Sequence, residues 1–192
     1  MQIKIKKNNI KIRITGGYLR SQYVYTQRSI NMRPTISIRR EMLFNWLDSY
    51  IYESSCLDCF SGSGILSIES ISRHAKFVTA LEIQKKNILS IRSNMNRLLI
   101  NNVKIVHTNT LKWLNSTNNN SFDIIFIDPP FYLNIINKII TLIYKNNFTK
   151  KDSLIYVEFY GSVEDLKIPK SWKLYKIKMN KKKKYILYKC LS

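Results

Sequence analysis

From residue 55 onward, strand-like and helix-like segments alternate, and this alternation restricts the possible folds more than any other feature of the sequence. Repeated β-α units are typical of a parallel sheet that is covered by helices on both faces. Two further strand-like runs near the C-terminus are joined by a turn and predict an antiparallel end to the sheet. The strand-like runs are 55–60, 76–82, 103–107, 122–128, 153–159, 172–179 and 184–190, and the helix-like runs are 65–74, 84–100, 109–115 and 133–146.

The segment before residue 55 has a different pattern. Alternating apolar residues over 10–25 are interrupted by Gly16-Gly17, which predicts a β-hairpin. Pro34 then interrupts the chain, because the residue before a proline avoids the helical region. An apolar stripe after it predicts a helix over 36–50.

The net charge predicts polyanionic partners such as nucleic acid or an acidic membrane surface. The chain of 192 residues carries 32 Lys and Arg against 12 Asp and Glu, a net +20. The charge is uneven, since residues 1–40 hold ten basic and no acidic side chains, whereas 41–130 hold eight of each. We expect a single domain overall, with a basic hairpin extension over 1–35 and an α/β domain over 36–192.

Codon composition is an alternative explanation for part of this charge. Lys, Ile and Asn are abundant and are encoded by A/T-rich codons, so drift could account for much of the run from Lys181 to Lys184. Drift explains the arginines less well, because six of the nine fall within the first 40 residues.

Other classes of protein are disfavoured. No window approaches 18 consecutive apolar residues, so we expect no membrane span, and the first residues lack the apolar stretch of a signal peptide. Three cysteines do not form a disulfide framework, so we expect a reducing cytoplasm.

The pair Cys56 and Cys59 forms a C-x-x-C within a strand-like run. Three strand residues span roughly 10 Å, beyond the roughly 7 Å limit for a disulfide. An odd separation also points the two side chains to opposite faces of a sheet. Because no second Cys/His pair completes a zinc site, we expect core packing and no metal.

The first strand leads into a glycine-containing turn, Asp58-Cys59-Phe60-Ser61-Gly62-Ser63-Gly64. In a doubly wound sheet, ligands bind at the carboxyl ends of the strands. Gly62 and Gly64 allow the backbone to turn tightly and to approach a ligand, although such turns also occur for packing alone.

Polar residues end the next two strands. Glu82 closes the second strand, eighteen residues after Gly64, where a carboxylate can accept the ribose hydroxyls of a nucleoside cofactor. Asn109 follows the third strand and could bind an adenine edge or, equally well, cap a helix. Together with the turn, Glu82 favours a nucleoside cofactor.

The fourth strand ends in Asp128-Pro129-Pro130-Phe131, the most specific motif of the chain. The two prolines fix φ and remove backbone donors, so the segment presents acceptors, namely the Asp128 carboxylate and a backbone carbonyl. These acceptors suit an exocyclic amine, and Phe131 offers a flat face for stacking of an extruded base.

At these residues the sequence resembles class I S-adenosylmethionine-dependent methyltransferases that modify exocyclic amines, and it is most similar to the bacterial RsmD family. That resemblance implies methylation of N2 of guanine 966 in 16S ribosomal RNA. It also implies a Rossmann-like, mostly parallel seven-stranded sheet with an antiparallel C-terminal strand, preceded by a small hairpin and helix. The matching stretches are Arg13 to Gly17 with Arg20, Arg33-Pro34-Thr35, Arg39 with Glu41 and Leu43 to Leu47, Leu57 to Gly64, Glu69 with Ser72-Arg73, Asp128 to Phe131, and Tyr156-Val157-Glu158.

The resemblance implies roles for individual residues. Asp128 would accept a hydrogen bond from the guanine amine, the Pro129 carbonyl would orient it, Pro130 would keep the segment rigid and Phe131 would stack on the base. The cofactor S-adenosylmethionine would contact Asp58, Gly62, Ser63, Gly64, Glu82, Asn109 and Thr110. The 16S rRNA, or the assembling 30S subunit, would be held by Arg13, Arg20, Arg33, Thr35 and Arg39, and a monomer is expected.

Three alternatives stay open on the sequence. A DNA adenine-N6 or cytosine-N4 methyltransferase shares the Asp128 motif, but no segment is long enough for a separate DNA-recognition domain. A catalytically inactive RNA-binding assembly factor would not need an intact cofactor turn and Asp128 motif. A nicotinamide-dependent oxidoreductase would leave the Asp128 motif unexplained.

Overall fold

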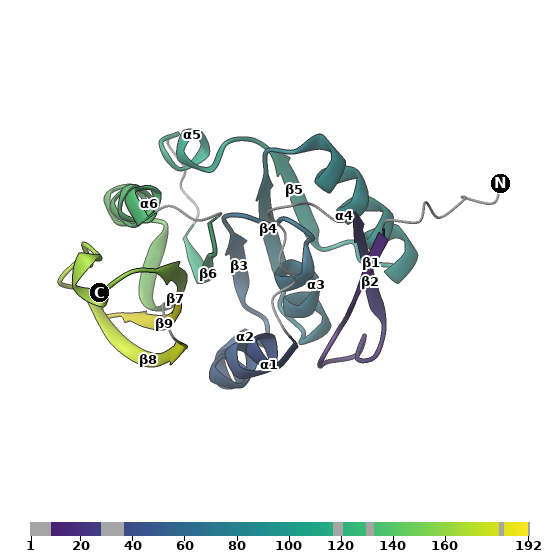
Figure 1. The fold of residues 1–192 in the computed structure, drawn as a ribbon, viewed down its shortest axis with the longest axis horizontal. Coiled ribbons are helices and arrows are strands. Elements are labelled where there is room, and N and C mark those ends of the chain that lie inside the picture. The colour runs from purple at the N-terminus through teal and green to yellow at the C-terminus, as the bar shows by residue number, and fades with distance from the viewer. Residues whose placement is uncertain (1–8, 28–36, 117–120, 130–132, 181–182, 192) are drawn as a thin grey trace.

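The large sheet of the protein has seven strands. The computed structural model describes residues 9–27, 37–116, 121–129, 133–180 and 183–191. Within this part of the chain the strand order is β5-β4-β3-β6-β7-β9-β8 (Figure 1). The strands are β3 (Ser55–Asp58), β4 (Phe77–Glu82), β5 (Val103–His107), β6 (Phe122–Ile127), β7 (Thr149–Tyr160), β8 (Trp172–Asn180) and β9 (Lys183–Cys190).

The pairing of the strands confirms the predicted fold class. The strands β3 to β7 pair in parallel with their neighbours, whereas β9 is antiparallel to both β7 and β8. The predicted mostly parallel sheet with an antiparallel C-terminal strand is therefore correct. β9 is that strand, and it lies between β7 and β8 rather than at the edge.

Helices cover both faces of the sheet. One apolar cluster joins the strands to α1, α2, α3 and α4, and a second joins the opposite face to α5 and α6. None of the helices in the described ranges is long and apolar enough to cross a membrane. The helices are α1 (Ser37–Trp46), α2 (Asp48–Ile51), α3 (Ile65–Ser72), α4 (Lys85–Leu98), α5 (Thr110–Leu114) and α6 (Leu133–Lys145), and a short 3₁₀ turn, η1, covers Val163–Asp165.

The helix expected over 36–50 is two helices. The Leu47 carbonyl accepts backbone hydrogen bonds from both Tyr50 (2.8 Å) and Ile51 (2.9 Å), so the turn tightens there and the regular ladder of α1 stops. The predicted capping residue Thr35 lies outside the described residues.

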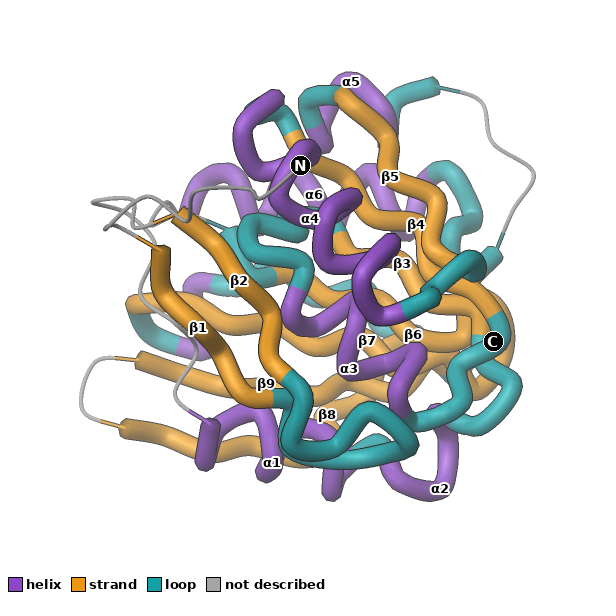
Figure 2. The backbone as a smooth tube through the Cα atoms, turned by 90° about the vertical axis from the view of Figure 1, so that its right-hand side faces the viewer, coloured by secondary structure: helices purple, strands orange, loops and turns teal. Residues whose placement is uncertain are grey.

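The predicted N-terminal hairpin is present as a separate two-stranded sheet. β1 (Asn9–Arg13) and β2 (Tyr23–Gln27) pair antiparallel, from Asn9 opposite Gln27 to Arg13 opposite Tyr23. Figure 2 shows this ribbon outside the large sheet, with its connecting loop beside α1 and α3. The connection is longer than a two-residue Gly-Gly turn, because it packs against α3.

Gly17 makes that packing possible. Its φ is +74°, and a Cβ there would overlap the Ser72 carbonyl at the end of α3. The next residue, Tyr18, donates its backbone N–H to the same carbonyl over 2.8 Å. The glycines therefore serve close approach between the hairpin loop and α3, and not only chain reversal.

Candidate active site

The carboxyl ends of adjacent strands bring together three of the predicted acidic residues. Asp58 ends β3, Glu82 ends β4, and Asp128 directly follows β6. The chain runs from β3 outward through β4 and β5, then crosses to the other side of β3 to form β6. This change of direction creates the crevice in which doubly wound sheets bind ligands.

The glycine turn between β3 and α3 is fixed by backbone hydrogen bonds. Gly64 donates its N–H to the Ser61 carbonyl over 2.6 Å, and Ser61 donates its N–H to the Leu81 carbonyl over 3.0 Å. The Ser61 hydroxyl adds a second bond to Leu81, at 2.9 Å. The turn is therefore held against β4 before any ligand enters.

The two glycines of this turn have different surroundings. Gly64 has φ +78°, and a Cβ there would lie 2.9 Å from Cγ1 of Ile91 on α4. Gly62 has φ +53°, and a Cβ there would meet nothing closer than the Phe60 carbonyl oxygen at 3.9 Å. Gly64 is thus needed for packing, whereas Gly62 faces open space in which a ligand can approach the backbone.

Glu82 already has several donors within the protein. Its Oε1 accepts the backbone N–H groups of Ile83 (2.8 Å) and Gln84 (2.7 Å). Its Oε2 accepts the N–H of Gly62 (2.9 Å) and Nδ2 of Asn87 (3.1 Å). A carboxylate has about four acceptor positions. A ribose hydroxyl would therefore have to share or replace one of these bonds, which the strand-end position of Glu82 did not predict.

Asp58 is buried beneath the turn. The Ser67 hydroxyl donates to its Oδ2 over 2.6 Å, and the Phe60 N–H donates to its Oδ1 over 3.3 Å. Burial raises the pKa of Asp58 to about 6, against the lowering effect of the Ser67 hydrogen bond, and Asp128 raises it further. Asp58 therefore changes charge close to neutral pH. Ser67, which lies on α3, was not predicted as a site residue.

The two predicted residues that follow β5 have largely structural roles. Asn109 caps α5, since its Oδ1 accepts the N–H of Lys112 over 3.2 Å, and its side chain remains exposed. The Thr110 hydroxyl donates to the Cys59 carbonyl over 2.6 Å and is buried. The Thr110 hydroxyl is therefore closed to a ligand, whereas the exposed side-chain amide of Asn109 can still bind one.

Asp128 and Pro129 are the described residues of the Asp-Pro-Pro-Phe motif, and Pro130 and Phe131 lie outside the described residues. Burial raises the pKa of Asp128 to about 6, and the positive charge of Lys183 opposes this rise. Pro129 is buried directly behind it. When ionised, the Asp128 carboxylate can accept hydrogen bonds but cannot donate them.

The strand β9 brings a cation to Asp128. Lys183, the first residue of β9, pairs with the buried carboxylate of Glu158 and lies 5.3 Å from the Tyr160 ring centroid. Glu158 also accepts a hydrogen bond from the Tyr156 hydroxyl over 2.9 Å. Lys183 was not predicted as a site residue, because it belongs to the lysine run for which codon drift is an alternative explanation.

The described RNA-binding candidates lie on the hairpin and on α1. Arg13 donates to the Ser21 hydroxyl over 2.8 Å, at the hairpin loop. Arg20 lies exposed in the same loop, whereas Arg39 on α1 lies over the Tyr185 ring, with Cζ 5.3 Å from the centroid. Arg33 and Thr35 are outside the described residues.

The two cysteines of the C-x-x-C lie in different apolar clusters on opposite faces of the sheet, as their odd spacing predicts. Both thiols are free and buried, and burial raises the pKa of Cys56 to about 12. Over the described ranges, no group of three or more His, Cys, Asp and Glu side chains could hold a metal ion.

Comparison with known proteins places this site in context. The family model described as "Conserved hypothetical protein 95" matches residues 12–189. A protein of Buchnera aphidicola subsp. Acyrthosiphon pisum, named ribosomal RNA small subunit methyltransferase D, is 45% identical over 184 residues, 96% of this chain and 96% of that protein. The protein of the same name from Escherichia coli K12 is 34% identical over 180 residues, 93% of this chain and 89% of that protein.

Solved structures of other proteins have a similar fold. The Escherichia coli protein yhhF matches with a TM-score of 0.87 at 33% identity, covering 95% of this chain and 99% of that chain. The crystal structure of SMU.776, complexed with SAH, matches with a TM-score of 0.72 over 98% of this chain and 58% of that chain. Its identity is 13%, so this second likeness shows the fold alone.

Proposed function

The chain belongs to the ribosomal RNA small subunit methyltransferase D family, and we propose that it transfers a methyl group from S-adenosylmethionine to the exocyclic N2 amine of a guanine in 16S rRNA. The observation that carries the chemistry is the placement of Asp58, Glu82 and Asp128 at one edge of the sheet. One wall of this crevice suits a nucleoside cofactor, and the other suits an amine.

The residues present fit S-adenosylmethionine. Gly62 leaves open space in which a ligand can approach the backbone, and the buried Asp58 carboxylate can receive the ammonium group of the methionine part. Ser63 and Gly64 are proposed to line the same part of the cofactor, Glu82 is proposed to accept the ribose hydroxyls in exchange for one of its internal donors, and Asn109 and Thr110 are proposed to border the adenine. When bound, the cofactor supplies a methyl group on a positively charged sulfur, and a structural neighbour of the same fold was crystallised with SAH.

Asp128 is proposed to position the amine. The nitrogen lone pair of an aryl amine is delocalised into the ring, so the amine is a weak nucleophile until its geometry is biased. The ionised Asp128 carboxylate can accept the neighbouring N1–H and N2–H donors of guanine, whereas adenine presents one donor beside one acceptor. Fixed acceptors can turn the lone pair toward the methyl group, and holding both reactants in line supplies much of the acceleration.

The surroundings of Asp128 support this assignment. Because nitrogen gains a methyl group, it must lose a proton, and a carboxyl with a pKa of about 6 can take up that proton and pass it to water. The Pro129 carbonyl is a second fixed acceptor, and Pro130 and Phe131 are proposed to complete the base-binding segment. Lys183 favours the ionised form of Asp128 that this role requires.

The RNA itself is proposed to bind through the basic N-terminal extension and α1. Arg13, Arg20 and Arg39 are the described candidates, and Arg33 and Thr35 belong to the same proposal. No partner other than RNA or the small subunit is needed for the reaction, and the location proposed for the protein is the cytoplasm, where that substrate is made.

One experiment tests the proposal. Purified protein is incubated with radiolabelled S-adenosylmethionine and small ribosomal subunits that lack the modification, and the labelled nucleotide is mapped. We expect one N2-methylguanine in 16S rRNA, and no label with the Asp128→Ala variant. Label on DNA, on another base, or on no nucleic acid would contradict the proposal, the last outcome favouring an inactive assembly factor.

A further inference from the structure

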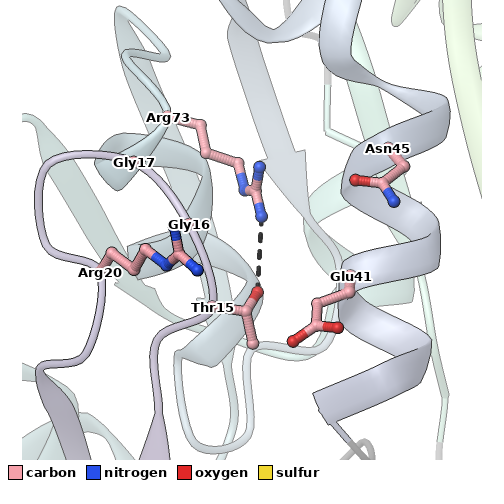
Figure 3. Close-up of a pocket in the computed structure, with 7 residues that line it drawn as sticks. All are labelled: Thr15, Gly16, Gly17, Arg20, Glu41, Asn45 and Arg73. Carbon is pink, nitrogen blue, oxygen red and sulfur yellow. Dashed lines mark hydrogen bonds between the residues drawn. The ribbon is translucent and has the colours of Figure 1, made fainter.

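A second hollow lies away from the proposed active site, between the hairpin loop, α1 and α3 (Figure 3). Its volume is about 530 Å³. It lies at the C-terminal end of α3, whereas the glycine turn lies at the N-terminal end, and eight helical residues separate the two by about 12 Å. The lining residues are Thr15, Gly16, Gly17, Arg20, Glu41, Asn45 and Arg73.

One wall of this hollow consists of hydrogen-bond donors. The Arg73 guanidinium lies against Gly16, where any Cβ would overlap it, and its Cζ is 4.9 Å from the Phe44 ring centroid. Its polar contacts with other described residues are long: 3.4 Å to the Thr15 hydroxyl and 3.9 Å to the Glu69 carboxylate. Its buried Nε has no hydrogen-bond partner among the residues that the structure describes. A guanidinium has five N–H donors, so most of the binding capacity of Arg73 is unused.

Arg20 adds a second guanidinium to the same wall. It extends from the hairpin loop toward the space that Arg73 borders (Figure 3). Its side chain is exposed, and no described side chain forms an ion pair with it. Two guanidinium groups at one hollow, of which Arg73 makes only long polar contacts with Thr15 and Glu69, are suited to a phosphate.

The opposite wall consists of acceptors. Glu41 and Asn45 are four residues apart on α1, so they lie on one side of the helix and face the hollow (Figure 3). Both side chains are exposed, and neither is paired within the described ranges. A phosphate alone would be repelled by the Glu41 carboxylate. A nucleotide, in contrast, offers a phosphate to the arginines and N–H or O–H donors to Glu41 and Asn45.

We propose that this hollow binds one ribonucleotide of the substrate RNA that flanks the target base, with its phosphate between Arg20 and Arg73 and its ribose hydroxyl or base donors on Glu41 and Asn45. The inference rests on the proposed function, because it takes the substrate to be RNA. Since the hollow lies about 12 Å along α3 from the glycine turn, it does not hold the reacting base. It binds the RNA strand beside that base and thereby determines which part of the RNA enters the active site.

The test measures RNA binding without methyl transfer. The probe is a fluorescein-labelled fragment of 16S rRNA that spans the methylated nucleotide, and its dissociation constant is measured by anisotropy over a series of salt concentrations. Arg20→Ala is expected to weaken binding about tenfold. It is also expected to reduce the log–log salt slope by about 0.7–0.9, as the loss of one phosphate contact requires. Arg92→Ala, which removes an exposed arginine of α4, is the matched control and should leave both values unchanged.

The direction in which Glu41→Ala changes the affinity for RNA decides between the two explanations. If the hollow were only part of a basic surface, removal of a negative charge would tighten RNA binding. The proposal expects weaker binding, because donors of the nucleotide lose their acceptor, and an unchanged affinity for S-adenosylhomocysteine, because the cofactor binds elsewhere. Tighter or unchanged RNA binding by Glu41→Ala would overturn the inference. If the wild-type protein methylates 16S rRNA in the same samples, that failure would leave the proposed function intact.

Discussion

The Nε atom of Arg40 donates a hydrogen bond to Oε2 of Glu69 over 2.9 Å, and both side chains are almost fully buried. Arg40 also donates from Nη2 to the Arg13 carbonyl over 2.6 Å, and Glu69 accepts the N–H of Thr15 over 2.6 Å. One ion pair therefore connects α1, α3 and the strand-to-loop junction of the hairpin. It also lies directly beneath the hollow that Arg73 borders.

The first prediction concerns this ion pair. Arg40→Met leaves the Glu69 carboxylate buried without its main partner, and breaking a buried pair in this way typically costs about 3–5 kcal/mol. Urea denaturation should show that loss, and hydrogen exchange should show faster opening of β1 and β2 than of the central strands. The control is Asp152→Asn, which removes an exposed partner of Lys189. An Arg40→Met protein that is as stable as the control would show that the pair is dispensable.

The second prediction concerns the role of Asp128. Asp128→Asn keeps the shape of the side chain but replaces one acceptor oxygen by a donor, so the rate of methyl transfer should fall by about a hundredfold or more. Binding of S-adenosylhomocysteine, measured by calorimetry, should remain within about twofold of the wild type, because the proposed cofactor wall is unaltered. A variant that loses cofactor binding and catalysis together would place Asp128 with the cofactor and not with the base.

The third prediction is the pH dependence of the reaction. Burial raises the pKa of Asp128 to about 6, and the proposed role needs its ionised form. The value of kcat/KM should therefore rise with pH through about 6 and then level off. Lys183 lowers this pKa, so Lys183→Met should move the rise to higher pH. The other titratable groups whose charges interact with Asp128 are Asp58, Tyr156 and Tyr185.

A variant of Glu158, the partner of Lys183, separates this shift of the pH profile from an effect of misfolding. Glu158→Gln removes the carboxylate that pairs with Lys183, so more of the positive charge acts on Asp128 and the rise should move to lower pH. The double variant Lys183→Met with Glu158→Gln leaves no unpaired charge from the pair in the core, and it should still show the shift to higher pH. Identical profiles for all three variants would mean that Lys183 is structural.

The fourth prediction compares two glycines of one turn. Gly64→Ala forces a Cβ to within 2.9 Å of Ile91 at φ +78°, so it should destabilise the fold by about 1–3 kcal/mol. Gly62→Ala also places alanine at a positive φ, +53°, which costs about 1–2 kcal/mol, but its Cβ enters open space, so this variant should in addition weaken cofactor binding. Thermal unfolding and calorimetry with S-adenosylhomocysteine measure the two effects. Equal loss of affinity in both variants, after correction for stability, would argue against ligand approach at Gly62.

Much of the fold was predictable, because the signals are local. The β-α alternation after residue 55 predicted β3 to β7, the two alternating runs near the C-terminus predicted β8 and β9, and the apolar run before Asp128 marked a central strand. The break in the helix at Leu47 and the long hairpin connection were not predictable. Both depend on tertiary contacts, such as the close approach of Gly17 to Ser72, that leave no periodic pattern in the sequence.

The candidate site was predictable to a similar extent. Asp58, Glu82 and Asp128 follow from their positions at strand ends, and the structure places all three at one edge. The internal donors to Glu82 could not be foreseen, because they come from backbone groups and from Asn87, near the start of α4. Lys183 was also missed, since only the insertion of β9 beside β7 brings it near Asp128.

The place of β9 also affects the order of events during synthesis. β9 follows β8 in the chain but lies between β7 and β8 in the sheet. Until it has been translated, the edge of β7 lacks its second partner, and Lys183 and Tyr185 are missing from the neighbourhood of Asp128. A nascent chain that ends before β9 would carry the glycine turn and Asp128 without the finished pocket. Translation of this strand is therefore the step that covers the edge of β7 and brings the charge of Lys183 to Asp128.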